Sequence, residues 1–244
     1  MGGLFGSRPP VVGLVGGIAS GKSTVSRILG ECGAAVIDAD KLGHESYEPG
    51  TACHRKLVAA FGGTIVADDG TIDRRKLGGL VFGNPDNMQR LQGIVWPEIR
   101  GMAQERIALH VREGAECIVL EAAVMLEAGW NDMVDELWVI QASPSVARER
   151  LMLRNSCTAE DADKRLVSQM SNKQRAAFAD VLLANDGALA GLEKKVRDLW
   201  DERKRGAWRE GRRRRQNGRL SLAAAATGAA AVLALVLLRL ARPK

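Results

Sequence analysis

A glycine-rich stretch near the amino terminus, GLVGGIASGKST, constrains this chain of 244 residues more than any other feature. Within it, residues 16–23 match the pattern GxxxxGK[ST] in full. An apolar run, VVGLV, precedes the pattern, and a run with helical periodicity, STVSRILGECG, follows it. This context predicts a loop between a strand and a helix, in which backbone N–H groups and the helix N-terminus bind phosphate. We therefore expect a bound nucleoside triphosphate.

The chemistry of phosphate binding explains why this loop contains these residue types. Small residues allow the tight turn that points successive N–H groups at one phosphate. Lys22 is expected to reach the β- and γ-phosphate oxygens, and the hydroxyl of Ser23 to bind Mg²⁺. The residues predicted to contact the nucleotide are Gly16, Gly17, Ile18, Ala19, Ser20, Gly21, Lys22, Ser23 and Thr24.

Strand-like and helix-like segments alternate along the rest of the body. Strands are expected at residues 11–15, 34–40, 116–122, 135–142 and 179–185. Helices are expected at residues 23–33, 143–155, 158–170 and 187–205, and the segment 44–112 is mostly helical with turns at EPG, FGG and DDG. Such alternation predicts an α/β fold of three layers with a central parallel sheet.

The net charge of +6 is unevenly distributed. Residues 201–244 carry 12 basic and 3 acidic side chains, whereas the preceding residues carry 23 basic and 26 acidic ones. The body is therefore mildly acidic, which argues against a nucleic-acid partner. The four cysteines are widely spaced, which argues against a zinc site and favours a reducing compartment.

The carboxyl-terminal region has a different composition. Residues 206–219 are predicted to form a basic linker, and the 19 residues 220–238 carry no charge. A helix of that length is roughly 28 Å long, close to the ~30 Å hydrocarbon core of a bilayer. We expect a transmembrane helix at 220–238 with a short tail at 239–244, although an alanine-rich helix docked on the body is the alternative. The arginines before the helix place the body on the cytosolic side, facing the mitochondrial outer membrane, the peroxisome or the endoplasmic reticulum.

Two carboxylates end the second predicted strand, in VIDAD. Side-chain alternation places Asp38 and Asp40 on one side of the strand, at the sheet edge where ligands bind. A carboxylate there can accept the proton of an attacking hydroxyl or bind Mg²⁺ through water, although one of the two is equally suited to capping a helix. Glu121, which ends the strand IVLE, is either a magnesium-orienting group or a plain strand-terminal residue.

Basic residues on the later helices fit the same chemistry. Arg150 and Arg154 are four residues apart, as are Arg165 and Gln169, so each pair is expected on one helical face. Arginines on a mobile helical pair can stabilise a transferred phosphoryl group. A GTPase is disfavoured because the only near match to NKxD is NKQR at residue 172, and a small kinase fits the chain length and the two aspartates. Another small nucleoside or nucleotide kinase, or an inactive nucleotide-binding membrane scaffold, remains an alternative.

Motifs along residues 11–204 together resemble the dephospho-CoA kinase family. They are the glycine loop, VIDAD, EPG, DGTIDRRKLGGLVFGN, IVWPEI, LEAAVMLEAGW, RLVSQMS and ADVLLANDG. Trp96 stands where most bacterial members have histidine, and EAAVML replaces a proline-containing run. Both variants are similar to the kinase half of animal bifunctional CoA synthase.

The resemblance implies ATP-dependent phosphorylation of the ribose 3′-hydroxyl of dephospho-CoA. It implies Asp40 as the base, Asp38 as a support for the acceptor or metal site, and Arg154 and Arg165 as lid arginines near the ATP phosphates. Glu127 and Trp130 are expected to line the acceptor cleft. The resemblance further implies a kinase domain over residues 11–205, preceded by an extension at 1–10. Within it, residues 41–112 are an acceptor-binding insert and residues 145–175 a lid.

Overall fold

The structure is a computed structural model that describes residues 8–207. The predicted apolar helix at 220–238, the tail at 239–244 and most of the basic linker lie outside the described residues. Among the residues that are described, no helix is long and apolar enough to cross a membrane.

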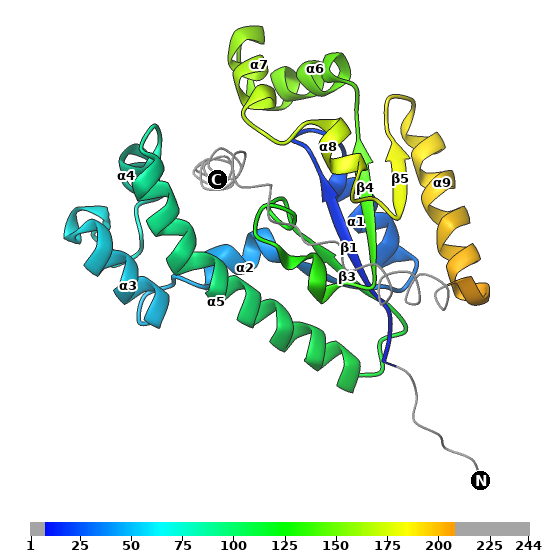
Figure 1. Ribbon diagram of the computed structural model, residues 1–244, viewed down its shortest axis with the longest axis horizontal. Helices are drawn as coiled ribbons and strands as arrows, with labels where there is room; N and C mark the ends of the chain where they lie inside the picture. Colours follow the sequence, from blue (N-terminus) through cyan, green and yellow to red (C-terminus); the bar gives the residue numbers. More distant parts are fainter. Residues whose placement is uncertain (1–7, 208–244) are drawn as a thin grey trace.

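Five parallel strands form one sheet with the spatial order β2-β3-β1-β4-β5 (Figure 1). The strands are β1 (Val11–Gly16), β2 (Ala35–Asp38), β3 (Ile118–Glu121), β4 (Glu136–Gln141) and β5 (Val181–Ala184). All six residues of β1 are buried, which is why this central strand reads as a continuous apolar run instead of an alternating one. The parallel sheet expected from the alternation of segments is confirmed.

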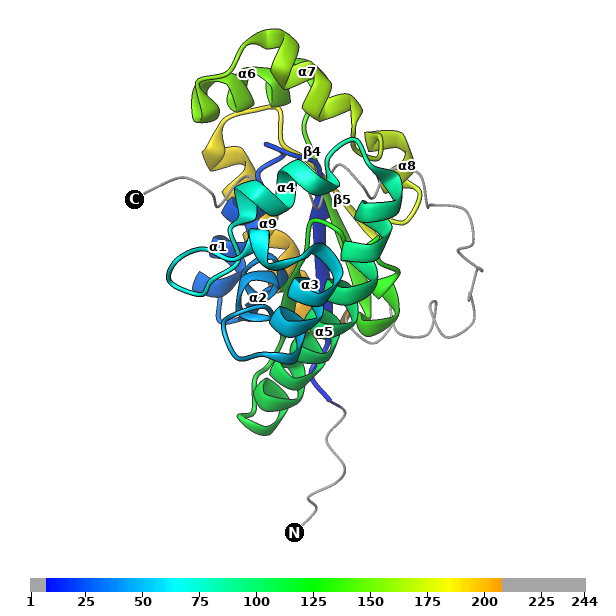
Figure 2. The same ribbon diagram turned by 90° about the vertical axis from the view of Figure 1, so that its left-hand side faces the viewer.

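Helices cover both faces of this sheet. They are α1 (Lys22–Glu31), α2 (Ala39–Glu45), α3 (Ala52–Phe61), α4 (Arg74–Val81), α5 (Pro85–Arg112), α6 (Pro144–Asn155), α7 (Ala159–Val167), α8 (Asn172–Ala176) and α9 (Leu189–Glu202). Short turns of other helix types lie at η1 (Gly63–Ile65), η2 (Trp130–Met133) and η3 (Arg203–Ala207). Figures 1 and 2 show α1 and α9 on one side of the sheet and α5 on the other.

Side-chain alternation along β1 feeds two separate cores. Val12 and Leu14 pack with residues of α1 and α9, whereas Val11 and Val15 pack with residues of the helices between β2 and β3. The three layers expected from the sequence are therefore confirmed.

The segment between β2 and β3 consists of α2, α3, α4 and α5, as the helical reading predicts. Its turns contain Gly50, Gly62 and Gly70, each with φ between 80° and 90°, a region that glycine adopts without strain. These positions match the turn signals EPG, FGG and DDG.

The helices after β4 depart from the expectation in two places. The predicted helix over 158–170 ends at Val167, so Gln169 lies beyond it. The short helix α8, which the sequence reading missed, begins at a capping box in which Ser171 and Gln174 satisfy each other's backbone N–H groups. Helices α6 and α7 lie beyond the carboxyl ends of the strands (Figures 1 and 2).

Candidate active site

The glycine-rich loop joins β1 to α1 at the carboxyl edge of the sheet. Gly21 has a φ of 99°, and a Cβ on it would lie 2.2 Å from Nδ2 of Asn185. A Cβ on Gly16 would lie 2.6 Å from the carbonyl oxygen of Ile140. Backbone and side chains therefore approach too closely for any larger residue at these two positions. The loop continues directly into α1, so the positive N-terminal end of that helix lies beside the loop.

A cleft of about 330 Å³ opens above this loop. Two arginines of α6, Arg150 and Arg154, line this cleft together with the loop, so they share one face of the helix, as their four-residue spacing predicts. The lining residues are Gly17, Ala19, Ser20, Gly21, Lys22, Ser23, Thr24, Arg150 and Arg154. The cleft therefore has cationic side chains opposite a row of backbone N–H groups, an arrangement suited to a polyphosphate.

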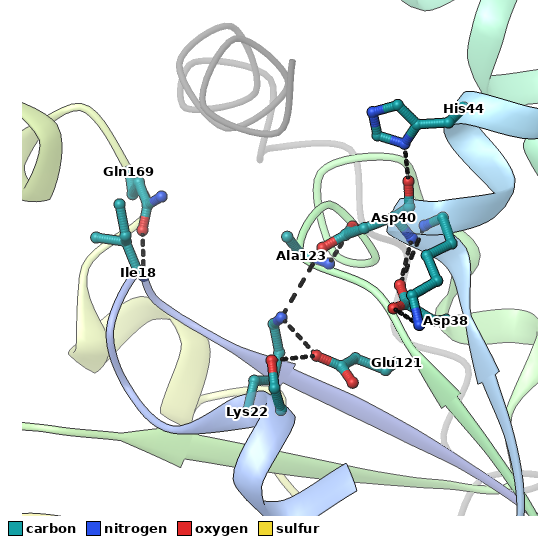
Figure 3. Close-up of polar contacts among 10 residues, drawn as sticks. Ile18, Lys22, Asp38, Asp40, His44, Glu121, Ala123 and Gln169 are labelled. Atoms are coloured by element: carbon teal, nitrogen blue, oxygen red, sulfur yellow. Dashed lines mark hydrogen bonds and ion pairs between the residues drawn. The ribbon is translucent and has the colours of Figure 1, made fainter. Parts of the chain in front are cut away.

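Two carboxylates lie beside the loop lysine (Figure 3). Nζ of Lys22 is 3.0 Å from Oε1 of Glu121 and 4.0 Å from Oδ2 of Asp40, and all three side chains are largely withdrawn from solvent. Oε1 of Glu121 also lies 3.5 Å from the hydroxyl of Ser23. β1 and β2 flank β3, and this pairing brings Glu121 level with Asp38 and next to the loop.

Asp40 does not end the second strand as predicted. β2 stops at Asp38, and Asp40 lies in the first turn of α2. The reason is local: Oδ1 of Asp38 accepts the backbone N–H groups of Asp40 and Lys41, so Asp38 is the helix N-cap. Asp38 and Asp40 are thus not an alternating strand pair, and only Asp40 is within 4.0 Å of Lys22.

The side chain of Asp40 is only 16% exposed. Its Oδ1 accepts the backbone N–H of Ala123 at 3.3 Å. Burial raises the pKa of Asp40, while the positive charge of Lys22 opposes that rise. A carboxylate with a raised pKa is a stronger base than an exposed aspartate, which is the property that proton transfer requires.

A second, apolar pocket begins at Asp40 and extends between α2 and α5. It is lined by Ala39, Asp40, Gly43, His44, Tyr47, Leu91, Val95, Ile99, Val124 and Trp130. Nδ1 of His44 lies 2.8 Å from the carbonyl oxygen of Asp40, and burial lowers the pKa of His44. The neutral ring therefore donates from Nδ1. Its Nε2 and the hydroxyl of Tyr47 are buried without a partner among the residues that the structure describes. Trp130, predicted in the acceptor cleft, lines this pocket.

Two other predicted site residues lie elsewhere. Arg165 and Glu127 line neither the cleft nor the apolar pocket. Burial raises the pKa of Glu127, and the charge of Arg175 opposes that rise, so Glu127 faces the Arg175 region instead. Arg165 and Gln169 do not share a helical face because α7 ends between them. Gln169 instead accepts the backbone N–H of Ile18, and Ile18 does not line the cleft.

Two residues missed from the sequence also contact the loop. Nδ2 of the buried Asn185 donates to the carbonyl oxygen of Ser20 at 2.8 Å. Arg175, in α8, is buried against Gly17. The signal for Asn185 was its place directly after the last strand, at the edge where sites form. Nothing local marks Arg175, because exposed helical arginines have the same appearance in a sequence.

The phosphate-binding loop leads from the central strand into α1, and Asp40 lies between this loop and a second, apolar pocket, which is the arrangement of a P-loop kinase. The comparisons with known proteins identify the branch. The family model for dephospho-CoA kinase matches residues 10–191. The chain belongs to the dephospho-CoA kinase family.

Individual relatives agree with this assignment. A dephospho-CoA kinase of Geobacter sulfurreducens is 44% identical over 193 residues, covering 79% of this chain and 98% of its own. That of Symbiobacterium thermophilum is 39% identical over 190 residues, covering 78% of this chain and 80% of its own. Among solved structures, dephospho-CoA kinase of Campylobacter jejuni superposes with a TM-score of 0.62 at 25% identity, covering 80% of this chain and 98% of its own.

Proposed function

We propose that this chain transfers the γ-phosphoryl group of ATP to the 3′-hydroxyl of the ribose of dephospho-CoA, forming CoA and ADP. One observation carries the proposal beyond family membership. Asp40 lines the apolar pocket and also lies 4.0 Å from Lys22 of the phosphate cleft, so one carboxylate borders both compartments. A hydroxyl group bound beside Asp40 is thereby placed next to the phosphate that Lys22 contacts.

Different residues of the chain contribute to different steps of this reaction. The loop N–H groups and Lys22 hold the β- and γ-phosphates, and Arg150 and Arg154 approach them from α6. Asp40 accepts the proton of the ribose 3′-hydroxyl while the oxygen of that hydroxyl forms a bond to the γ-phosphorus. The bond from that phosphorus to the bridging oxygen breaks, and ADP leaves with the electron pair. Trp130 and Tyr47 provide an apolar wall and a hydrogen-bonding hydroxyl for the acceptor.

Mg²⁺ fits the oxygen groups at the end of the loop. The Ser23 hydroxyl and Oε1 of Glu121, 3.5 Å apart, are hard oxygen donors of the kind that Mg²⁺ prefers. Mg²⁺ is ordinarily held by one or two protein groups together with the phosphates, and when bound it neutralises charge on the β- and γ-oxygens. Ser23 is the proposed direct ligand, and Glu121 would hold the ion through water. Ser23→Ala is expected to raise the Mg²⁺ concentration required for half-maximal activity.

The insert at 41–112 and the lid at 145–175 are assigned complementary roles. The insert contributes most of the apolar pocket through α2 and α5, which supports acceptor binding. The lid contributes Arg150 and Arg154 to the phosphate cleft. Glu127 and Arg165 remain proposed site residues that would join the substrates only after the lid moves.

An acceptor assay tests the activity. The purified chain is incubated with ATP, Mg²⁺ and dephospho-CoA, and CoA and ADP are quantified by chromatography with mass detection. Equimolar CoA and ADP are expected, with adenosine and AMP as control acceptors. Efficient phosphorylation of another nucleoside or nucleotide with dephospho-CoA left unchanged would favour the alternative small kinase. No turnover with any acceptor, despite ATP binding, would favour an inactive scaffold.

The charge-free run at 220–238 is proposed as a carboxyl-terminal membrane anchor that leaves the kinase facing the cytosol. Its length and the preceding arginines support this, and it lies outside the described residues. Alkaline carbonate extraction of a membrane fraction from cells expressing the chain is the test. Retention in the pellet is expected, with a chain ending at Gly218 as the control that is released. Release of both chains would rule out an integral anchor.

A further inference from the structure

Arg175 stands out among the charged side chains because its burial is not accompanied by an ion pair. It is only 6% exposed. Among the residues that the structure describes, no carboxylate lies within 4.0 Å of its guanidinium group, and its hydrogen-bond partners are two amide oxygens. These are Oδ1 of Asn172 at 3.5 Å and Oε1 of Gln169 at 3.3 Å. A buried charge of this kind is costly unless an opposite charge compensates it.

Glu127 is the carboxylate whose charge acts on Arg175, although the two form no ion pair within the described part of the chain. Burial lowers the pKa of Arg175, and the charge of Glu127 opposes that change only in part. Burial likewise raises the pKa of Glu127. Among residues 8–207, the charge of the Arg175 guanidinium is therefore not balanced by an ion pair.

The position of this charge is fixed against the phosphate loop. A Cβ on Gly17 would lie 2.9 Å from Nη1 of Arg175. Gln169 ties the two elements together, because its Oε1 accepts both the backbone N–H of Ile18 at 2.8 Å and Nη2 of Arg175. Figure 3 shows Gln169 hydrogen-bonded to Ile18 near the start of the loop, whereas Lys22 lies where the loop enters α1.

The same guanidinium lies near the acceptor side of the site. Glu127 belongs to the connection between β3 and η2, which also contains Ala123, bonded to Asp40, and the pocket residue Val124, and which leads directly to Trp130. Arg175 therefore lies where the phosphate loop and the acceptor-side connection meet. The N-terminus of α1 and the end of the loop bind the α- and β-phosphates. A cationic group at the start of the loop, beside Gly17, is therefore next to the γ-phosphate.

We infer that Arg175 is a further catalytic residue, which donates hydrogen bonds to the nonbridging oxygens of the γ-phosphoryl group as it passes to the acceptor, and that Gln169 is the positioning residue that holds it. This inference rests on the proposed function. No bond to Arg175 forms or breaks; the phosphorus–oxygen bond to the acceptor forms as the bond to ADP breaks. A buried, pre-positioned cation needs little rearrangement as charge develops, unlike the exposed Arg154 of the lid.

The experiment compares Arg175→Met and Arg175→Lys with the unchanged chain. Removing one such donor is expected to lower kcat by about 10²–10³-fold. Binding by calorimetry is the decisive readout: the affinity for a non-hydrolysable ATP analogue falls at least about tenfold in Arg175→Met, while the affinity for ADP, which lacks the γ-phosphate, stays unchanged. Arg175→Lys keeps the charge but not the planar fork, so it recovers part of the loss.

Lys173→Met is the matched control, because it removes a positive charge from an exposed position of the same helix. It is expected to leave kcat and both affinities within about twofold of the unchanged chain. Gln169→Leu removes the oxygen that Arg175 and Ile18 share, and combined with Arg175→Met it should add little further loss of kcat, as expected for groups acting as one unit.

Equal losses of ATP-analogue and ADP affinity in Arg175→Met would overturn the inference and assign a structural role to the residue. Should Arg175→Met fail to fold, Arg175→Lys decides: unchanged kcat and nucleotide discrimination would overturn it. The binding comparison needs no acceptor. A chain that binds the ATP analogue through Arg175 but does not phosphorylate dephospho-CoA would contradict the proposed function and leave the γ-phosphate contact standing.

Discussion

Nζ of Lys22 lies 3.0 Å from Oε1 of Glu121, and both side chains are buried where β3 ends beneath the phosphate loop. The helix N-terminus that begins at Lys22 and the strand that ends at Glu121 therefore meet through one ion pair. This pair holds the loop lysine in the interior and aims it along the sheet edge toward Asp40.

Removing one partner of this pair is expected to destabilise the fold. Lys22→Met removes the positive charge that pairs with the buried Glu121 carboxylate, and it should lower the free energy of unfolding by about 3–5 kcal/mol. The measurement is urea denaturation at neutral pH. Lys22→Met combined with Glu121→Gln should recover part of that loss, since the second change removes the buried negative charge. Equal stability of the single variant and the unchanged chain would contradict a buried ion pair.

Asp40→Asn removes the proposed base while keeping the size of the side chain. We expect kcat to fall by at least ~10² because the hydroxyl proton loses its acceptor. KM for ATP should change little, since the loop and Lys22 remain. Steady-state kinetics with dephospho-CoA provide the measurement, and an unchanged kcat would remove Asp40 from this role.

The pH dependence of kcat should report the surroundings of Asp40. Burial raises its pKa, and the charge of Asp38 adds to that rise. A base must be deprotonated, so kcat falls as pH decreases through this raised pKa. Asp38→Asn removes the added charge but retains an oxygen that caps α2, so the acid limb should move to lower pH.

Asp73→Asn is the control for that shift. Asp73 caps α4 in the same way that Asp38 caps α2, and its charge does not contribute to the raised pKa of Asp40. Its acid limb should coincide with that of the unchanged chain. Stability depends on pH in the direction opposite to kcat: because the pKa of Asp40 is raised in the folded state, this group contributes stability at low pH that is lost as pH rises through the raised pKa. An acid limb that stays in place in Asp38→Asn would assign the limb to another group.

Tyr47→Phe tests the apolar pocket as the acceptor site. The hydroxyl has no partner among the described residues, so its loss should leave the melting temperature unchanged or slightly higher. If the hydroxyl binds the acceptor, KM for dephospho-CoA should rise by up to about tenfold, the equivalent of one hydrogen bond. KM for ATP serves as the internal reference. A parallel rise of both KM values would indicate a general disturbance of the site instead.

Much of this arrangement was readable from local sequence. The glycine loop, the buried run of β1 and the turn glycines at 50, 62 and 70 each determine their own backbone, so the parallel sheet and the helical segment after β2 could be predicted. The spacing of Arg150 and Arg154 predicted that both lie on one helical face, because helical periodicity needs no tertiary information, whereas the position of that face at the phosphate cleft depends on the fold.

The misses have physical causes. Alternation suggested a strand through Asp40, but the cap made by Asp38 ends the strand two residues earlier, so a local hydrogen bond outweighed the pattern. The helix expected to carry Gln169 ends at Val167, which frees Gln169 to reach Ile18 across 151 positions of chain. The burial of Arg175 depends on that long-range packing and has no local signature.

The placement of Asp38 and Asp40 at the start of α2 has a consequence for engineering. The proposed base, Asp40, directly precedes the proposed acceptor-binding insert at 41–112, and most of the pocket residues lie in the single contiguous stretch from Ala39 to Arg112. The nucleotide loop depends instead on β1, α1 and the Asn185 contact. A library confined to that stretch, with the α2 cap kept, is therefore the economical way to retarget this scaffold to other alcohols while preserving its phosphate donor.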